Sequence, residues 1–105
     1  MKKILLTCVL LLFINPVFAA DIVIEWDANT ESNIDYYNVY YGTEHGVYNA
    51  PVDVGNVLGY TIVGLNAGTY YITVTAVDTG DNESEFSYEV VKKLKVSMVT
   101  GIALP

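Results

Sequence analysis

The sequence lacks several residues on which protein chemistry often depends. It contains one cysteine, Cys8, one histidine, His45, and no arginine. A disulfide needs two cysteines, so the chain can form none within itself. A serine–histidine–acid triad would have to use His45, which lies in a glycine-flanked turn, where a histidine is usually just solvated. We therefore expect no catalytic residues, and the chain is predicted not to be an enzyme.

Basic residues are also scarce. Five lysines oppose twelve acidic residues, which gives a net charge of −7. Without Lys2 and Lys3, which stand at the extreme N-terminus, three lysines remain against the twelve acids, for a net charge of −9. Nucleic-acid binding requires basic groups that displace counterions from phosphates. We exclude nucleic acid as a partner and interpret the acidic surface as an aid to solubility.

The N-terminal segment has the organisation of a secretory signal peptide. Lys2 and Lys3 precede an apolar run from Ile4 to Ile14, and Ala19 and Ala20 offer small residues for cleavage. The apolar run is too short for a stable membrane span, although an uncleaved anchor is the alternative. We expect residues 1–20, with Cys8, to be removed. The exported protein would then be periplasmic or extracellular, with no membrane insertion.

Removal of residues 1–20 from the 105 leaves 85 residues, enough for one domain that is held together by its core alone. This part of the chain shows strand periodicity and no helical periodicity. The longest alternation follows a turn at Gly68, and its inward residues are Tyr70, Ile72, Val74 and Ala76. Shorter strands are predicted at 21–26, 36–42, 48–54, 60–63 and 86–90. Such short strands, separated by turn signals, predict an all-β sandwich.

The same alternation assigns faces to two earlier strands. In the strand at 21–26, the residues predicted to point inward are Ile22, Ile24 and Trp26. In the strand at 36–42, Tyr37, Val39 and Tyr41 are predicted inward, and Tyr36, Asn38 and Tyr40 outward. The segment at 48–54 contains Pro51, which cannot donate to a ladder, so we expect an edge strand there.

Four motifs occur in order and at domain spacing, namely Ile24–Asn29, Tyr37–Gly42, Gly64–Tyr70 and Asp81–Ser84. Together they resemble a fibronectin type III domain of the bacterial secreted kind, over residues 21–93. The resemblance implies an immunoglobulin-like sandwich of two sheets. It also implies that Trp26 packs in the core against Tyr37 and Leu65. Tyr70 would be the corner tyrosine, whose hydroxyl bonds to the backbone a few residues upstream.

The sequence departs from the family pattern at two places. The corner is one residue shorter than usual and has Ala67 where the family has proline, but parity selects Tyr70 over Tyr71 as the inward residue. The family's first strand, strand A, should precede Ile22, yet cleavage leaves little chain there. Strand A is therefore expected to be short or absent, which leaves a bare sheet edge that promotes aggregation unless it is covered.

Residues 94–105 form a strand extension or tail. Leu94, Val96 and Met98 continue the apolar alternation of the last strand. The tail could overhang the sheet, fold back over the vacant edge, or add as a strand to a neighbouring molecule. The second and third arrangements leave self-association open.

Outward tyrosines are the most distinctive surface feature. Tyr36, Tyr40 and Tyr71 would share one exposed face, where aromatic rings could stack on sugars or anchor a protein. Alternatively, tyrosine simply favours strands and pairs well across them.

Asp78, Asp81 and Glu83 suggest a calcium site, but their spacing favours a turn, so no metal or cofactor is predicted.

The sequence thus predicts a secreted, non-catalytic binding or spacer module at a cell, virion or polysaccharide surface. The partner would be a protein or a polysaccharide. One alternative is an assembly subunit that joins copies through the open sheet edge and the tail. The other is a carbohydrate-binding accessory to a hydrolase. Glycoside hydrolysis itself needs two carboxyl groups across a cleft, for which so small a sandwich has little room.

Overall fold

A computed structural model describes residues 19–95, so most of the predicted signal peptide and the tail from Val96 lie outside the described residues. The chain between these limits is all-β and contains no helix. Its strands are β2 (Ala20–Glu25), β3 (Ile34–Gly42), β4 (Val52–Gly55), β5 (Gly59–Leu65), β6 (Gly68–Asp78) and β7 (Val90–Leu94). Within residues 19–95, no helix could cross a membrane.

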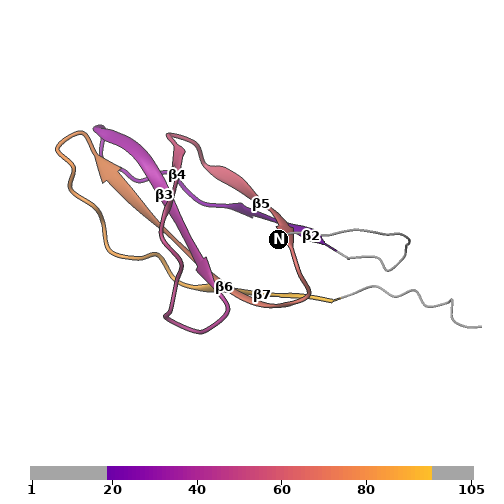
Figure 1. The fold of residues 1–105 in the computed structure, drawn as a ribbon. Helices are drawn as coiled ribbons and strands as arrows, with labels where there is room; N and C mark the ends of the chain where they lie inside the picture. Colours follow the sequence, from indigo (N-terminus) through magenta and orange to yellow (C-terminus); the bar gives the residue numbers. More distant parts are fainter. Residues whose placement is uncertain (1–18, 96–105) are drawn as a thin grey trace, which may run out of the picture.

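The strands form two antiparallel sheets that face each other (Figure 1). The smaller sheet pairs β2 with β5, and the larger one has the order β4-β3-β6-β7. The core between them centres on Ile22, Val39, Ile62, Tyr70 and Ile72. The predicted two-sheet sandwich is therefore confirmed.

The inward faces follow the predicted alternation. Ile22 is buried, and Ile24 and Trp26 pack against the core from the same side of β2. Tyr37 is buried too, and its ring lies 5.6 Å from that of Trp26, centroid to centroid. Leu65 packs against the same cluster. These contacts fit a half-buried strand, in which every second side chain faces the opposite sheet.

Tyr70 lies just after the turn that joins the two sheets. Its side chain is buried, and its hydroxyl donates to the carbonyl oxygen of Asn66 at 2.9 Å. Gly68 has a φ of 152°, which a residue with a side chain rarely adopts, so the turn depends on glycine at this position. The hydroxyl thereby ties the first residues of β6 to the turn.

The predicted last strand is wrong at its start. β7 begins at Val90 instead of Phe86, because residues 84–89 run beside β6 without forming a regular ladder. Ser84 donates its backbone N–H to Ala76 and accepts the Ala76 N–H on its hydroxyl, and Ser87 does the same with Val74. Serine hydroxyls thus replace backbone carbonyls as acceptors. From Ser84 to Ser87, three residues of this segment therefore lie beside only two residues of β6.

The outer face of the larger sheet is more buried than alternation predicts. Asn38, Thr73 and Thr75 point away from the core, yet each is at least nine-tenths buried. Residues 83–89, which we call the cover segment, lie over this face. The Glu83 carboxylate accepts hydrogen bonds from Asn38 and Thr75, and Thr73 donates to the Ser87 carbonyl oxygen. Alternation predicts the direction of a side chain but not whether another segment covers it.

We expect Tyr70→Phe to lower the free energy of unfolding by about 1–3 kcal/mol, because the Asn66 carbonyl loses its donor in a part-buried position. Tyr71→Phe is the matched control and should be nearly neutral, since no hydrogen bond of the Tyr71 hydroxyl is found within residues 19–95. Urea unfolding measures both. Equal losses would show that the tie to Asn66 is not what Tyr70 contributes.

Candidate functional site

The cover segment presents every third residue to the outer face of the larger sheet. Glu83 contacts β3 and β6, Phe86 contacts β3, and Glu89 contacts the turn after β3. This spacing follows from the serine pairing, which advances three residues of the segment along two residues of β6. Two carboxylates and an aromatic ring are therefore lined up over a sheet whose own side chains are hydroxyls and tyrosines.

Glu83 lies at one end of this row and gathers three donors. Its Oε2 atom accepts hydrogen bonds from the hydroxyls of Tyr40 and Thr75, the latter at 2.6 Å, and from the Asn38 amide at 3.4 Å. These hydrogen bonds, first that of Thr75 and then that of Tyr40, lower the pKa of the Glu83 carboxyl. The same contact raises the pKa of Tyr40. All three donors use one oxygen, which leaves Oε1 available to a further donor.

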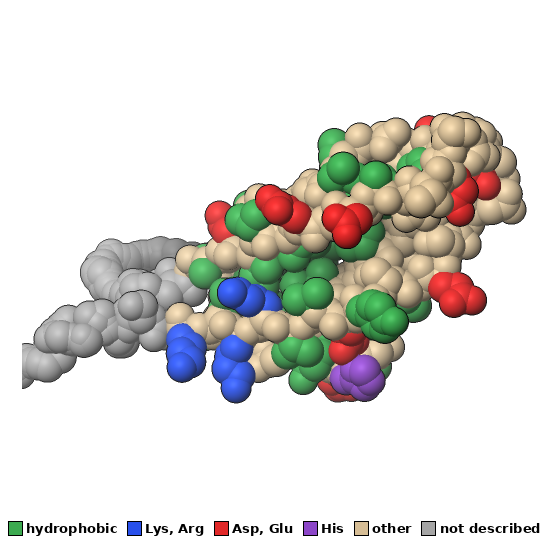
Figure 2. All heavy atoms as spheres, turned by 180° about the vertical axis from the view of Figure 1, so that it is seen from behind, with side chains coloured by type: hydrophobic (Ala, Val, Ile, Leu, Met, Phe, Trp, Pro, Cys, Tyr) green, Lys and Arg blue, Asp and Glu red, His purple; other side chains and the backbone are tan. Residues whose placement is uncertain are grey.

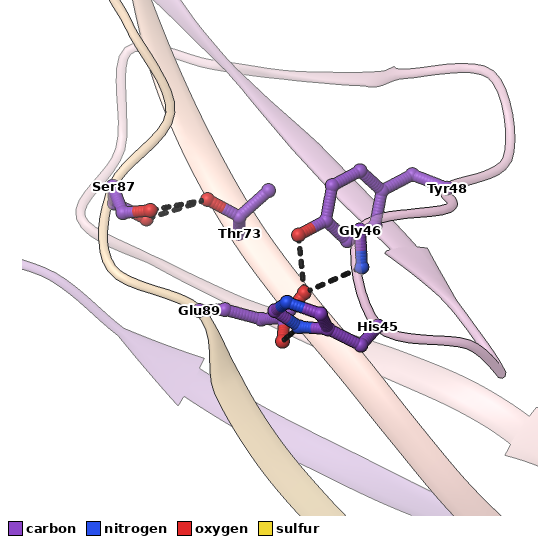
Figure 3. A network of polar contacts seen from close by, with 6 residues as sticks. All are labelled: His45, Gly46, Tyr48, Thr73, Ser87 and Glu89. Carbon is purple, nitrogen blue, oxygen red and sulfur yellow. Dashed lines mark hydrogen bonds and ion pairs between the residues drawn. The ribbon is translucent and has the colours of Figure 1, made fainter.

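Glu89 lies at the other end, against the turn that follows β3 (Figure 3). It accepts the Tyr48 hydroxyl, approaches His45 Nδ1 at 2.6 Å and accepts the Gly46 N–H at 3.1 Å. Hydrogen bonding by Tyr48 and His45 lowers the pKa of Glu89, while the Glu89 carboxylate raises the pKa of Tyr48 to about 12. The carboxylate thus fixes the turn to the cover segment.

An aromatic cluster of Tyr40, Tyr48 and Phe86 lies between the two carboxylates. The Phe86 ring meets Tyr40 edge-on at 5.0 Å and Tyr48 at 5.4 Å, measured between ring centroids. Phe86 is nevertheless 55% exposed. A hollow of about 220 Å³ opens beside it, lined also by Tyr40, Thr75 and Glu83. The hollow thus combines an exposed ring with a carboxylate and a hydroxyl.

The three tyrosines predicted to form an exposed face are not brought together. Tyr36, Tyr40 and Tyr71 lie on the outer side of the larger sheet, opposite Val77, Thr73 and Gly42 in register. Within residues 19–95, no two of their rings pair with each other. Tyr40 packs under Phe86, and Tyr71 instead faces the ring of His45 at 6.3 Å. The aromatic surface is therefore centred on Phe86, which sequence reasoning placed in a strand and left without a role.

The acidic loop after β6 is a turn held by its own carboxylate. Asp78 accepts the backbone N–H groups of Gly80 and Asn82 at 2.8 and 2.9 Å, and these contacts, led by Asn82, lower its pKa. Asp81 has a positive φ of 66°. Within residues 19–95, no group of three metal-ligating side chains is found. The side chain of His45 is 83% exposed and contacts the Glu89 carboxylate.

We expect Glu83→Gln to destabilise the fold at neutral pH. A carboxyl whose pKa is lowered in the folded state stabilises that state above its ordinary pKa of 4.5, and the effect disappears as the pH falls through the folded value. The difference in stability between wild type and variant should thus be full at pH 7 and shrink below pH 4.5. Glu85→Gln removes the same charge from a neighbouring side chain and is the control. Urea unfolding across the pH range would contradict the assignment if both variants behaved alike.

The chain resembles one region of a larger solved protein. It aligns with the crystal structure of a β-1,2-glucanase from Parabacteroides distasonis with a TM-score of 0.64 and 28% sequence identity. The alignment covers 79% of this chain but 12% of that one, so this chain spans about an eighth of the glucanase. No protein-family model and no curated protein matches the sequence.

Proposed function

We propose that this chain is an exported, non-catalytic module of the fibronectin type III kind that binds polysaccharide through the hollow beside Phe86. The observation that carries the proposal is the 28% identity to a region that makes up 12% of a β-1,2-glucanase. A module that recurs as a small part of a polysaccharide-degrading enzyme fits an accessory role. The sequence motifs of residues 21–93 and the signal-like N-terminus support the same reading.

Two features of the fold support the family assignment. The order β4-β3-β6-β7 opposite β2-β5 is what the family would give without its first strand. The hydrogen bond from Tyr70 to Asn66 has the geometry that a tyrosine corner requires. Because one sandwich architecture hosts many functions, the ligand has to be argued from the site itself.

The electrostatics of the carboxylates favour binding over hydrolysis. Glycoside hydrolysis needs one carboxylic acid with a raised pKa to protonate the leaving group. The pKa values of Glu83 and Glu89 are both lowered by the hydrogen bonds that they accept. Both groups are therefore ionised near neutral pH. A carboxylate in that state can accept a hydrogen bond from a sugar hydroxyl but cannot donate a proton to the leaving group.

The hollow has the groups that recognise a sugar. Phe86, at 55% exposure, offers a ring on which a pyranose can stack, and Oε1 of Glu83 offers an acceptor for a hydroxyl group. Its volume of about 220 Å³ suits a single ring rather than a long enclosed chain. A protein ligand, the other class expected from the sequence, would use the same aromatic surface and is distinguished by the following test.

We expect Phe86→Ala to weaken retention on a β-1,2-glucan matrix about tenfold, which corresponds to 1.4 kcal/mol of lost stacking. Tyr88→Ala removes another aromatic ring, 97% exposed, from the same stretch of chain and should leave retention unchanged. Both side chains are mainly exposed, so both variants should keep the fold, as circular dichroism can verify. Equal retention of the two variants, or no retention of the wild type, would contradict a sugar site beside Phe86.

A further inference from the structure

Within residues 19–95, the β2 edge of the smaller sheet has no strand beside it. Trp26 donates its backbone N–H to Leu58 at 3.1 Å, and pairing alternates along an antiparallel ladder. Ile24 therefore also directs its backbone groups to β5, whereas Val23 and Glu25 direct theirs away from it. Within residues 19–95 no strand takes these groups, so β2 is a template for strand addition.

A hollow runs beside this edge, between β2 and residues 84–90. Two neighbouring cavities, of about 310 and 210 Å³, share Trp26, Val74 and Ser87 as lining residues. Seen from behind, hydrophobic side chains show between an upper layer with acidic residues and a lower layer with the lysines (Figure 2). We call this side of the sandwich the open side. The opposite side is spanned by the short connection from β4 to β5, at residues 56–58.

The open side is incomplete as it stands. Core residue Ile72 lines its wall, and the buried indole N–H of Trp26 has no hydrogen-bond partner within residues 19–95. Val90, opposite Ile72 at the rim, is more than half exposed. An extended apolar strand would cover these side chains and pair with Val23 and Glu25, which is how edge strands recruit an extra strand.

Residues 96–105 have the pattern of such a strand. Their even positions are mostly large and apolar, whereas the odd positions are smaller; the even series is Val96, Met98, Thr100, Ile102 and Leu104. Ten residues span about 33 Å when extended. β7 ends at Leu94, which pairs with Gly68, and β2 begins at Ala20, which pairs with Leu65. Because Leu65 and Gly68 flank one short turn, β7 ends at the same end of the sandwich where β2 begins.

This placement favours the tail of a second copy over the chain's own tail. The chain's own tail would have to reverse direction and cross the roughly 10 Å between the sheets, using several residues, and would then run parallel to β2. A tail from another copy can use its full length and run antiparallel, which is the more stable pairing per residue.

Charge supports the same arrangement. The three lysines of the described chain, Lys92, Lys93 and Lys95, lie at the root of the tail. Among the described residues, the opposite end of the sandwich carries no lysine but several acidic side chains, including Asp27, Glu31, Asp35, Asp78 and Asp81. In an antiparallel addition, the root of the incoming tail lies against the Glu25 end of β2. The basic end of one copy then meets the acidic end of the next, which steers association and fixes its direction.

We propose that residues 96–105 of one copy add as an antiparallel strand to β2 of a second copy and cover its open side. The contact is head-to-tail: the copy that donates its tail keeps a free edge, and the copy that accepts it keeps a free tail, so assembly continues into chains. This assembly goes beyond sugar binding and does not require it, because the hollow beside Phe86 lies on the outer face of the other sheet.

The test measures the mass of the exported protein by light scattering over a concentration series. With increasing concentration, the mass of the wild type should rise from that of a monomer to multiples of it. Added salt should oppose this rise because it screens the attraction between the basic and acidic ends. Met98→Asp with Ile102→Asp places charges on the face that enters the open side and should keep the protein monomeric. Ser97→Asp with Ala103→Asp adds the same charge on the other face and should assemble as wild type does.

The acceptor edge is tested by proline. Val23→Pro removes a backbone N–H that points away from β5 and should abolish assembly while the sheet survives. Thr61→Pro, directly opposite on β5, removes the N–H that faces the other free edge and is the control, with assembly retained. Thermal unfolding verifies that both variants are folded.

A mixture decides between head-to-tail addition and any other contact. The Val23→Pro variant keeps its tail, and the Met98→Asp/Ile102→Asp variant keeps its edge, so together they should form a dimer and stop there. A wild type that stays monomeric at every concentration overturns the proposal. So does a tail variant that assembles as wild type does, or a mixture that remains monomeric. Retention on glucan is read separately, so either proposal can fail alone.

Discussion

The hydrogen bonds between two serine hydroxyls and β6 set the register on which the rest of the surface depends. The hydroxyls of Ser84 and Ser87 accept backbone N–H groups that a carbonyl would accept in a regular strand pair. Three residues of this segment therefore lie beside two residues of β6. This spacing turns Glu83, Phe86 and Glu89 toward the sheet. It also delays β7 until Val90, and among residues 19–95 no strand covers the part of the core beside β2.

The protein satisfies its carboxylates mainly with hydroxyl and backbone donors. With no arginine and few lysines, Glu83 and Glu89 accept from tyrosine and threonine hydroxyls, an amide and a backbone N–H. Glu89 also contacts the ring of an exposed histidine, His45. Such contacts lower the pKa of each carboxyl and keep the charge at neutral pH.

The two-sheet sandwich and the inward faces of its strands were predictable because they depend on the local alternation of apolar and polar residues. Alternating apolar residues in β2, β3 and β6 direct Ile22, Val39 and Ile72 inward whatever surrounds them. The turn at Gly68 could be read as well, since few residues adopt its backbone conformation. The candidate site was not predictable in the same way. Phe86 is near Tyr40 and Tyr48 because a segment some forty residues later in the chain lies over β3, and no local pattern encodes that distance.

By itself, the sequence determined the all-β class, the positions of most strands, their inward faces and the excess of negative charge. These follow from residue type and from a two-residue period, which act over a few neighbours. Tertiary structure alone decided that serines replace strand pairing, that Glu83 and Glu89 close over the outer sheet, and that no strand of the described chain other than β5 pairs with β2. Each of these depends on how segments far apart in the chain satisfy one another's hydrogen bonds, and that is settled only when the whole chain has packed.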